Sequence, residues 1–294
     1  MVVKVEKYCN SQVIEWLWAS NNELIPSPFF TSCYLIDGLL IDSGAPAGAN
    51  DLSDFISALN KDEMVKKCVI THTHEDHAGG ANMLQKKFNI PIYASEKALP
   101  ILKKGYSYPE YRKITWGECL KPIEAKSIKS PVTTSSEEYI FEVFPMPGHA
   151  PELIALVEKN QEWAFVSDAV QPKYKMLFGN KSSIQEDLNL IYDSIANLFN
   201  FTENMENLKI FVSGQGLFNG RNYLIEKLNE IEILHKKAHK IYQNELQEGV
   251  NKEKALKRVL KKLFKRESVI GKLTGGDLSI MNLIKELIKW PLKE

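Results

Sequence analysis

The chain has 294 residues, of which 44% are apolar and 25% are charged, and its formal net charge is zero. This composition is typical of a globular protein, and the length suits one large domain with an appendage, because domains usually run to roughly 100–250 residues. The sequence contains no run of about 18 apolar residues, so neither a membrane-spanning helix nor a membrane partner is expected.

The N-terminal segment, MVVKVEKYCNSQVIEWLW, lacks the basic start, apolar middle and small-residue cleavage site of a secretory signal. We therefore expect no export and a cytoplasmic location. The four cysteines, Cys9, Cys33, Cys68 and Cys119, are widely spaced and form no CxxC pair. This spacing favours reduced cysteines packed in the interior over a disulfide framework or a metal knuckle.

Two short β-rich runs, residues 31–36 and 39–42, flank an Asp-Gly pair, and this pattern predicts a β-hairpin. An amphipathic helix is predicted next, over about residues 51–59. Residues 64–71 (MVKKCVIT) then indicate a buried strand that ends where a group of histidines begins. The segment THTHEDHAGG is therefore placed on a loop at the C-terminal end of a strand.

A helix over residues 81–88 and a strand over residues 90–94 complete a β-loop-α-β unit after this loop. Residues 105–136 show no regular pattern, and we predict no element there. From residue 137 the strand pattern returns, and residues 138–144 run into the loop PMPGHAP.

Residues 152–158 and 162–170 predict a second hairpin around a KNQ turn, with His149 before it and Asp168 at the end of its second strand. A helix over about residues 183–198 follows. A strand over residues 209–213 then runs into Gly214, Gln215 and Gly216.

Residues 221–294 differ from the rest of the chain in composition. They show helical periodicity with lysine-rich faces, and breaks near Gly249, at Gly271 and at Gly275–Gly276 indicate three helices. This part carries 17 Lys plus Arg against 10 Asp plus Glu, so it is basic by 7 charges and the remainder is acidic by the same amount. We divide the chain into a first domain of residues 1–220, for which the motifs described below predict catalysis, and a basic helical region of residues 221–294.

The spacing of the histidines in THTHEDH indicates metal binding. Side chains alternate in an extended segment, so His72 and His74 can point to one ion, while Asp76 and His77 lie past the bend and can face a second. Imidazole and carboxylate ligands suit zinc, iron or manganese, whereas calcium and magnesium favour sites richer in oxygen. We expect zinc first, with iron or manganese as alternatives.

With its motifs LLIDSG, THTHEDH, PGH and SDA, the chain resembles the metallo-β-lactamase superfamily over roughly residues 28–220. The resemblance implies an α/β fold, a four-layer αββα sandwich of two mixed β-sheets, followed here by a helical C-terminal extension. It also implies that His72, His74 and His149 hold a first metal. Asp42, in the strand motif LLIDSG, would support the ligands from behind.

By the same resemblance, Asp76, His77 and Asp168 would hold a second metal, with Asp168 as the bridging carboxylate. Where the family has a last histidine in a GHG-like turn, this chain reads SGQG, with Gln215. An amide oxygen is a poorer zinc ligand than imidazole, so we expect the second metal to be weaker, absent or differently placed. Gln215 remains open between a weak ligand and a loop residue, and Asp76 between a catalytic general base and a ligand only.

Two further groups of residues suggest binding, and the simpler interpretation is favoured for each. His235 and His239 are four apart on a predicted helix and could share a metal, but their neighbours indicate a solvated face. Residues 252–266 are rich in lysine, which would suit nucleic-acid binding. Their leucines recur at helical spacing, however, so the lysines can simply form the solvent-exposed face of an amphipathic helix.

The motifs THTHEDHAGGAN and PMPGHAP are similar to those of the hydroxyacylglutathione hydrolase and small-molecule hydrolase branches of the family. They favour a hydrolase that uses a zinc-activated water on an ester-type bond, a thioester or lactone, in a small and anionic substrate. A nuclease or phosphodiesterase is the alternative, disfavoured by the neutral net charge, because phosphate binding normally requires a basic surface. A scaffold that binds metal only for stability is the third possibility.

Overall fold

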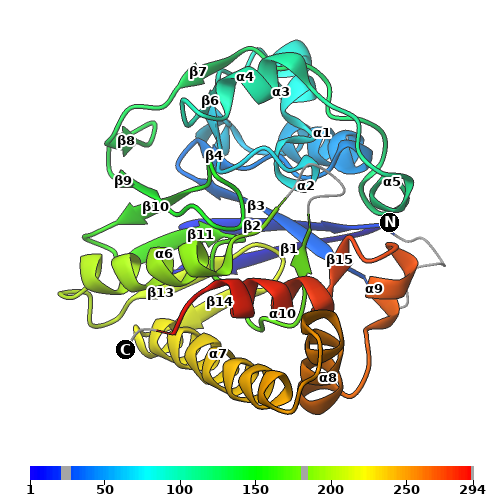
Figure 1. The fold of residues 1–294 in the computed structure, drawn as a ribbon. Helices are drawn as coiled ribbons and strands as arrows, with labels where there is room; N and C mark the ends of the chain where they lie inside the picture. Colours follow the sequence, from blue (N-terminus) through cyan, green and yellow to red (C-terminus); the bar gives the residue numbers. More distant parts are fainter. Residues whose placement is uncertain (21–27, 180–184, 293–294) are drawn as a thin grey trace. The chain divides into compact units, whose positions relative to one another are not determined.

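The structure, a computed structural model, describes residues 1–20, 28–179 and 185–292 (Figure 1). The chain forms two compact units. Unit 1 consists of Met1–Pro145, Pro151–Asp168 and Asn207–Phe218, and unit 2 of Met146–Ala150, Ala169–Glu206 and Asn219–Glu294. Residues 183 and 184, with which the predicted helix 183–198 begins, lie outside the described residues.

The first sheet of unit 1 has seven strands in chain order. They are β1 Val2–Tyr8, β2 Val13–Ala19, β3 Phe30–Ile36, β4 Leu39–Ile41, β5 Lys67–Ile70, β6 Ile92–Ala94 and β7 Ala125–Ser127. The pairs from β1 to β4 are antiparallel and those from β4 to β7 are parallel, so the sheet is mixed. Parallel strands end at the same edge, so the loops that follow β4, β5 and β6 gather there.

The predicted hairpin is confirmed in β3 and β4, where Ile36 pairs with Leu39. Its two turn residues, Asp37 and Gly38, have φ angles of 40° and 74°. Positive φ at both central positions is the type I′ geometry that matches the twist of the strands, which is why Asp-Gly predicts it. β5 and β6 are shorter than predicted.

The second sheet of unit 1 has six strands in the order β14-β13-β11-β10-β9-β8. They are β8 Val132–Thr133, β9 Ile140–Pro145, β10 Ile154–Glu158, β11 Trp163–Ser167, β13 Lys209–Val212 and β14 Gly216–Asn219. β10 and β11 form the predicted hairpin. β13 pairs with β11 in parallel, which brings the ends of these two strands together and makes this sheet mixed as well.

One apolar core joins the two sheets. Phe165 of β11 stacks on Phe211 of β13 with ring centroids 4.4 Å apart, and Tyr34 of β3 lies edge-on to Phe165 at 5.1 Å. The neighbours of Tyr34 on β3, Cys33 and Leu35, belong to a second core on the other face of the first sheet. This alternation is the period-two pattern of a sheet buried on both faces.

Short helices of unit 1 contribute to that second core. Their bounds are η1 Pro46–Gly48, α1 Ala49–Ser57, η2 Lys61–Glu63, α2 Glu75–Ala78, α3 Ala81–Phe88, α4 Leu99–Lys104 and α5 Glu110–Trp116. Leu52 of α1 and Leu84 of α3 are buried in it. α3 has the predicted bounds, whereas α5 lies in the stretch for which we predicted no element.

Unit 2 contains five helices among the described residues and a two-stranded sheet. They are α6 Leu188–Phe201, α7 Asn222–Gln247, α8 Lys252–Phe264, α9 Val269–Leu273 and α10 Ile280–Lys289, with β12 Leu177–Phe178 paired to β15 Leu278–Ser279. α6 begins where the side chain of Asp187 accepts a hydrogen bond from the amide of Leu190. The break at Gly249 is confirmed, but Gly271 lies inside α9, so four helices replace the predicted three after residue 221.

The expected solvated face around His235 and His239 on α7 is wrong. The two residues are 5% and 6% exposed, and their Nε2 atoms lie 2.7 and 2.9 Å from the carbonyl oxygen of Trp290. The Trp290 ring stacks on His235 at 4.3 Å. These histidines satisfy carbonyl groups at the end of α10, a role that depends on a contact between segments far apart in the sequence.

The lysines of α8 follow the expected pattern, because Val259 is buried while Lys254, Lys257 and Lys261 are exposed. Within the described part of the chain, no helix is long and apolar enough to cross a membrane.

The cysteines are all free thiols, and Cys33 and Cys68 are buried as expected. Cys119 is exposed, so the prediction that it packs in the interior is wrong.

Candidate metal centre

The histidine loop begins where β5 ends. Residues 71 and 72 form a bend, where the carbonyl of Thr71 accepts a hydrogen bond from the amide of Ile154 at 3.0 Å, and α2 then starts at Glu75 with His74 as the residue before it, in the extended conformation. A bend followed by a helical turn therefore sets the directions of the predicted ligands, in place of the extended segment that their spacing predicts. His72, His74 and His77 are all buried.

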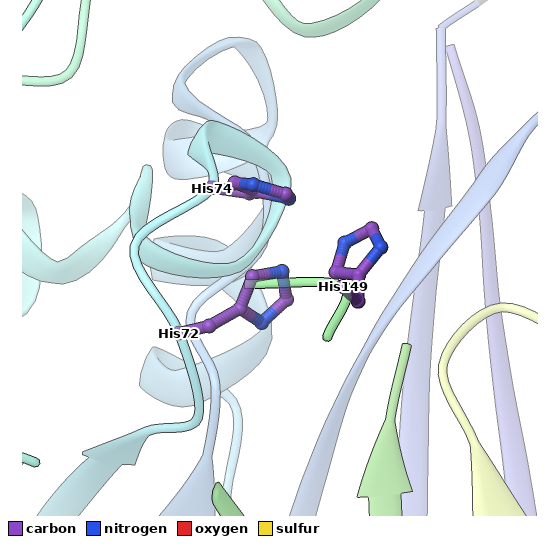
Figure 2. Close-up of side chains that lie close together, drawn as sticks. All are labelled: His72, His74 and His149. Carbon is purple, nitrogen blue, oxygen red and sulfur yellow. The ribbon is translucent and has the colours of Figure 1, made fainter. Parts of the chain in front are cut away.

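Three of the predicted ligands form a compact group. The ligand nitrogens of His72, His74 and His149 lie within 4.8 Å of one another, and Figure 2 shows their rings gathered around one space. His149 follows β9 on the loop PGHA, as the motif indicates. Its Nδ1 lies 2.7 Å from Oε1 of Glu186. Because a carboxylate only accepts hydrogen bonds, Nδ1 carries the proton and Nε2 is left to bind a metal.

A second group contains His72, His77 and Asp168, whose ligand atoms also lie within 4.8 Å of one another. Nε2 of His77 is 3.3 Å from Oδ2 of Asp168 and 3.6 Å from Oδ2 of Asp76. Asp76, His77 and Asp168 are thus brought together. Both groups contain His72, which we had expected to serve the first metal alone.

Asp42 lies directly behind His77. Its carboxylate accepts hydrogen bonds from the amide of Thr71 at 2.7 Å and from the Thr71 hydroxyl at 2.8 Å. Oδ2 is also 2.8 Å from Nδ1 of His77, which assigns the imidazole proton to Nδ1 and turns Nε2 toward Asp168. The position agrees with the supporting role that the resemblance implies for Asp42.

The second group concentrates negative charge around one imidazole. Burial alone lowers the pKa of His77, but the carboxylates of Asp168, Asp76 and Asp42 outweigh it and hold this pKa well above its usual value. Burial raises the pKa of Asp76, and Asp168 raises it further against the opposing effect of His77. Asp42 is buried and Asp76 and Asp168 are partly buried, and carboxylates in such proximity are stabilised by a cation, a charge that a divalent metal would supply.

The donor atoms fit a zinc-type ion. Nitrogen and oxygen ligands lie about 2.0–2.1 Å from zinc, so tetrahedral neighbours are about 3.4 Å apart. The donors of each group lie within 4.8 Å of one another, and because one nitrogen of His72 binds one ion only, this histidine can complete either group but not both. Neutral imidazole with one or two carboxylates is also the donor set that zinc, iron and manganese prefer.

Gln215 occupies the turn between β13 and β14. Its amide donates a hydrogen bond to the carbonyl of Val212 at 3.0 Å, and the residue is exposed. The structure therefore places it at the predicted turn, and its side chain is the one predicted donor that is solvent-exposed.

Sequence reasoning missed two residues that hold this centre in place. Glu186 orients His149, and Ser167 lies with its hydroxyl 3.2 Å from Nδ1 of His77. Neither residue belongs to a spacing pattern that is visible in the sequence. Ser167 adjoins Asp168 in the SDA motif, so its position in the motif is the one signal that could have indicated it.

Fold and site together define a mixed α/β protein of two face-to-face sheets with a candidate metal centre of histidines and aspartates. A family model, that of the metallo-beta-lactamase superfamily, matches residues 26–198, more than half of the chain. The chain belongs to the metallo-beta-lactamase superfamily.

Curated relatives share parts of this chain at modest identity. Hydroxyacylglutathione hydrolase GloC of Haemophilus influenzae is 28% identical over 51% of this chain and 72% of its own length. A hydroxyacylglutathione hydrolase of Bdellovibrio bacteriovorus is 26% identical over 42% of this chain and 41% of its own. Ribonuclease J 1 of Streptococcus pyogenes is 38% identical over 22% of this chain and 13% of its own length. The chain thus spans less than half the length of the latter two relatives.

Solved structures confirm the fold class. A metallo-beta-lactamase from Pontibacter korlensis superposes with a TM-score of 0.60 at 19% identity, over 78% of this chain and 98% of that one. The metallo-beta-lactamase FIM-1 from Pseudomonas aeruginosa, in a mono-zinc form, superposes with a TM-score of 0.59 at 16% identity. The superposition covers 78% of this chain and 95% of that one. At these identities the likeness establishes the αββα sandwich and no more.

Proposed function

We propose that the protein is a cytoplasmic, metal-dependent hydrolase that cleaves an ester-type bond, a thioester or a lactone, in a small anionic substrate. The observation that carries the proposal is the pair of donor groups that share His72 at the end of β5. Membership of the metallo-beta-lactamase superfamily supports the same conclusion.

In this proposal His72, His74 and His149 hold the first metal. His77 and Asp168 hold a second one, together with Asp76. Gln215 is at most a weak ligand of the second metal, because its side chain is exposed and an amide oxygen binds zinc less well than imidazole. We therefore expect a strongly bound first ion and a weakly bound or absent second one.

When bound, a zinc ion lowers the pKa of a coordinated water to about 7 and polarises a carbonyl oxygen. The carboxylate of Asp76 accepts the proton of the attacking water at Oδ2 and returns it to the departing thiolate or alkoxide. His77, fixed by Asp42, keeps its Nε2 beside Asp76 and Asp168 and so maintains the orientation of both carboxylates.

The hydroxyacylglutathione hydrolases among the relatives support a thioester substrate. Their names specify an acyl group on the thiol of glutathione, which is an anionic carrier. A lactone presents the same acyl carbon with an alkoxide leaving group, so the same residues would serve it. A panel of S-acyl glutathiones and lactones separates the two substrate classes.

A nuclease or phosphodiesterase is the second candidate. Ribonuclease J 1 of Streptococcus pyogenes and an exodeoxyribonuclease of Bacillus anthracis match short parts of this chain. The exposed lysines of α8 would suit a phosphate backbone, whereas the zero net charge does not. Hydrolysis of a phosphodiester but of no acyl substrate would favour this candidate over the first.

The test compares the wild type with His72→Ala on thioester, lactone and phosphodiester substrates. His72 contributes to both donor groups, so its removal should abolish hydrolysis, a fall of more than about 100-fold. His239→Gln is the matched control, since it also removes a buried histidine but leaves both groups intact. Activity that survives in His72→Ala would refute the proposal. A wild type inactive on the whole panel that loses thermal stability when the metal is removed would favour a scaffold.

A further inference from the structure

The loop that carries the ligands is anchored through the residues between them. His72 and His74 belong to one donor group, and Thr73 and Glu75 alternate with the predicted ligands along the chain. Both of these intervening residues are buried. Each of them binds a polar side chain from a segment far away in the sequence.

Thr73 has partners on two sides. Its amide and its hydroxyl donate to Oε1 of Glu152 at 3.1 and 2.6 Å. Its carbonyl accepts a hydrogen bond of 2.9 Å from the hydroxyl of Tyr106. All three polar groups of this residue are thus satisfied, which fixes the peptide planes on both sides of it.

Glu75 forms a fork-to-fork ion pair with Arg112. Nη2 donates to Oε2 at 2.6 Å, and Nε donates to Oε1. Glu75 is 0% exposed and Arg112 is 3% exposed, so the pair is fully withdrawn from water. The Tyr106 hydroxyl lies 3.4 Å from the same carboxylate and links this pair to the anchor of Thr73.

Arg112 reaches the loop from α5, a short helix in the segment where the sequence shows no pattern. Its guanidinium lies over the ring of Tyr108 at 5.9 Å, and the Tyr108 hydroxyl donates to the carbonyl of Gly117 at 2.9 Å. The neighbouring carbonyl of Glu118 is a second partner of that hydroxyl. These contacts restrict where the guanidinium can be placed.

A buried ion pair does not by itself show that its residues serve to stabilise the fold. The loss of hydration offsets much of the attraction between the charges, and well-packed apolar residues of similar volume often serve as well or better. Two parallel hydrogen bonds, in contrast, define the direction of a carboxylate in a way that apolar packing cannot. Glu75 lies directly between His74 and Asp76 in the chain, so a constraint on Glu75 also constrains the backbone that carries both of them.

We propose that Arg112 is a positioning residue for the metal centre, which acts by holding Glu75 and thereby the backbone that carries His74 and Asp76. The inference rests on the proposed metal centre, and it assigns the segment from Tyr106 to Arg112 the task of fixing ligand geometry. Residues that orient metal ligands typically change metal affinity by about 10- to 100-fold when they are replaced.

The experiment replaces the pair as a unit in the full-length chain. In Arg112→Met with Glu75→Leu no charge is left unpaired, so the metal-free protein should melt near the wild-type temperature. Zinc affinity, measured by competition with a chelator, should nevertheless fall by about 10- to 100-fold. The control replaces the ion pair between Arg258 of α8 and Glu245 of α7 by the same residue types; this also removes the partner of the exposed Lys262, and zinc affinity should not change.

Arg112→Lys and Tyr106→Phe keep the test decisive if the double variant folds poorly. Lysine preserves the charge but not the planar fork, so zinc affinity should fall less than in the double variant. The visible spectrum of the cobalt-substituted protein reports ligand geometry and should shift in both variants. An unchanged affinity and spectrum in both would overturn the proposed role of Arg112. A wild type that binds no zinc would instead refute the proposed function.

Discussion

Replacing Asp42 by asparagine tests how the protein orients the second group of ligands. The carboxylate of Asp42 accepts two hydrogen bonds from Thr71 at 2.7 and 2.8 Å and one from His77 at 2.8 Å. The amide of asparagine has one acceptor oxygen, so its NH₂ group would face a donor. Each hydrogen bond to a charged group contributes about 1.5–3 kcal/mol. Because at least one is lost, Asp42→Asn should lower the free energy of unfolding by about 2–3 kcal/mol.

Metal binding should respond separately from stability. With Nδ1 of His77 no longer held by a carboxylate, zinc affinity should fall by about 10- to 100-fold. Denaturant unfolding of the metal-free protein measures the first effect, and chelator competition measures the second. Asp37→Asn is the matched control, since Asp37 also accepts amide and hydroxyl hydrogen bonds, from Ser136, but contacts no predicted ligand. If Asp42→Asn loses stability and keeps wild-type zinc affinity, then Asp42 does not orient His77.

Three further predictions concern metal content and pH. Glu186→Gln should weaken the hydrogen bond to Nδ1 of His149 and lower zinc affinity by about 10-fold. Chelator competition measures the affinity, and an unchanged value would contradict this prediction. Gln215→His should raise the bound zinc from about one equivalent to about two, because imidazole is a better zinc ligand than an amide oxygen. Metal analysis of the purified proteins measures this, and two tightly held ions in the wild type would contradict the prediction. Burial lowers the pKa of His235, so the folded state resists its protonation. Its contribution to stability is present above its ordinary pKa of 6.5 and is lost as the pH falls below that value, because the unfolded chain then binds the extra proton. Urea unfolding between pH 8 and pH 5 should therefore show a smaller loss of stability in His235→Asn than in the wild type, with equal slopes as the refuting outcome.

Local signals explain the parts of the fold that the sequence predicts well. The hairpin of β3 and β4 needs two turn residues with positive φ, and Asp37 and Gly38 supply them. α3 has the predicted bounds, since it begins after two glycines and ends at Phe88, followed by Asn89 in the left-handed conformation. In such elements the residues that determine where the element begins and ends lie next to it in the sequence.

Other elements depend on contacts that the sequence does not display. β2 is buried along its whole length, so it lacks the alternation of polar and apolar residues that identifies a half-buried strand. α5 has a buried arginine whose partner, Glu75, is 37 residues away. His235 and His239 looked solvated between lysines, and their carbonyl partner, Trp290, is more than 50 residues further on.

The same contrast holds for the candidate site. Its histidines and aspartates were identifiable because ligand spacing on strand ends and loops is a short-range pattern. Glu186 contacts His149, and Glu152 and Arg112 contact Thr73 and Glu75 of the histidine loop, but none of these three residues follows a spacing rule. Only the folded chain brings them to this loop and to His149, so their contacts were invisible to sequence reasoning, unlike that of Asp42, which the motif LLIDSG indicated.

Zinc titration of the metal-free protein is the most direct test of the central claim, that His72 is a ligand of a bound metal ion. The wild type should bind about one equivalent tightly, with any second one more weakly, and His72→Ala should lose the tight site while His239→Gln keeps it. Equal zinc binding by the wild type and His72→Ala, or no tight binding by the wild type, would contradict the account.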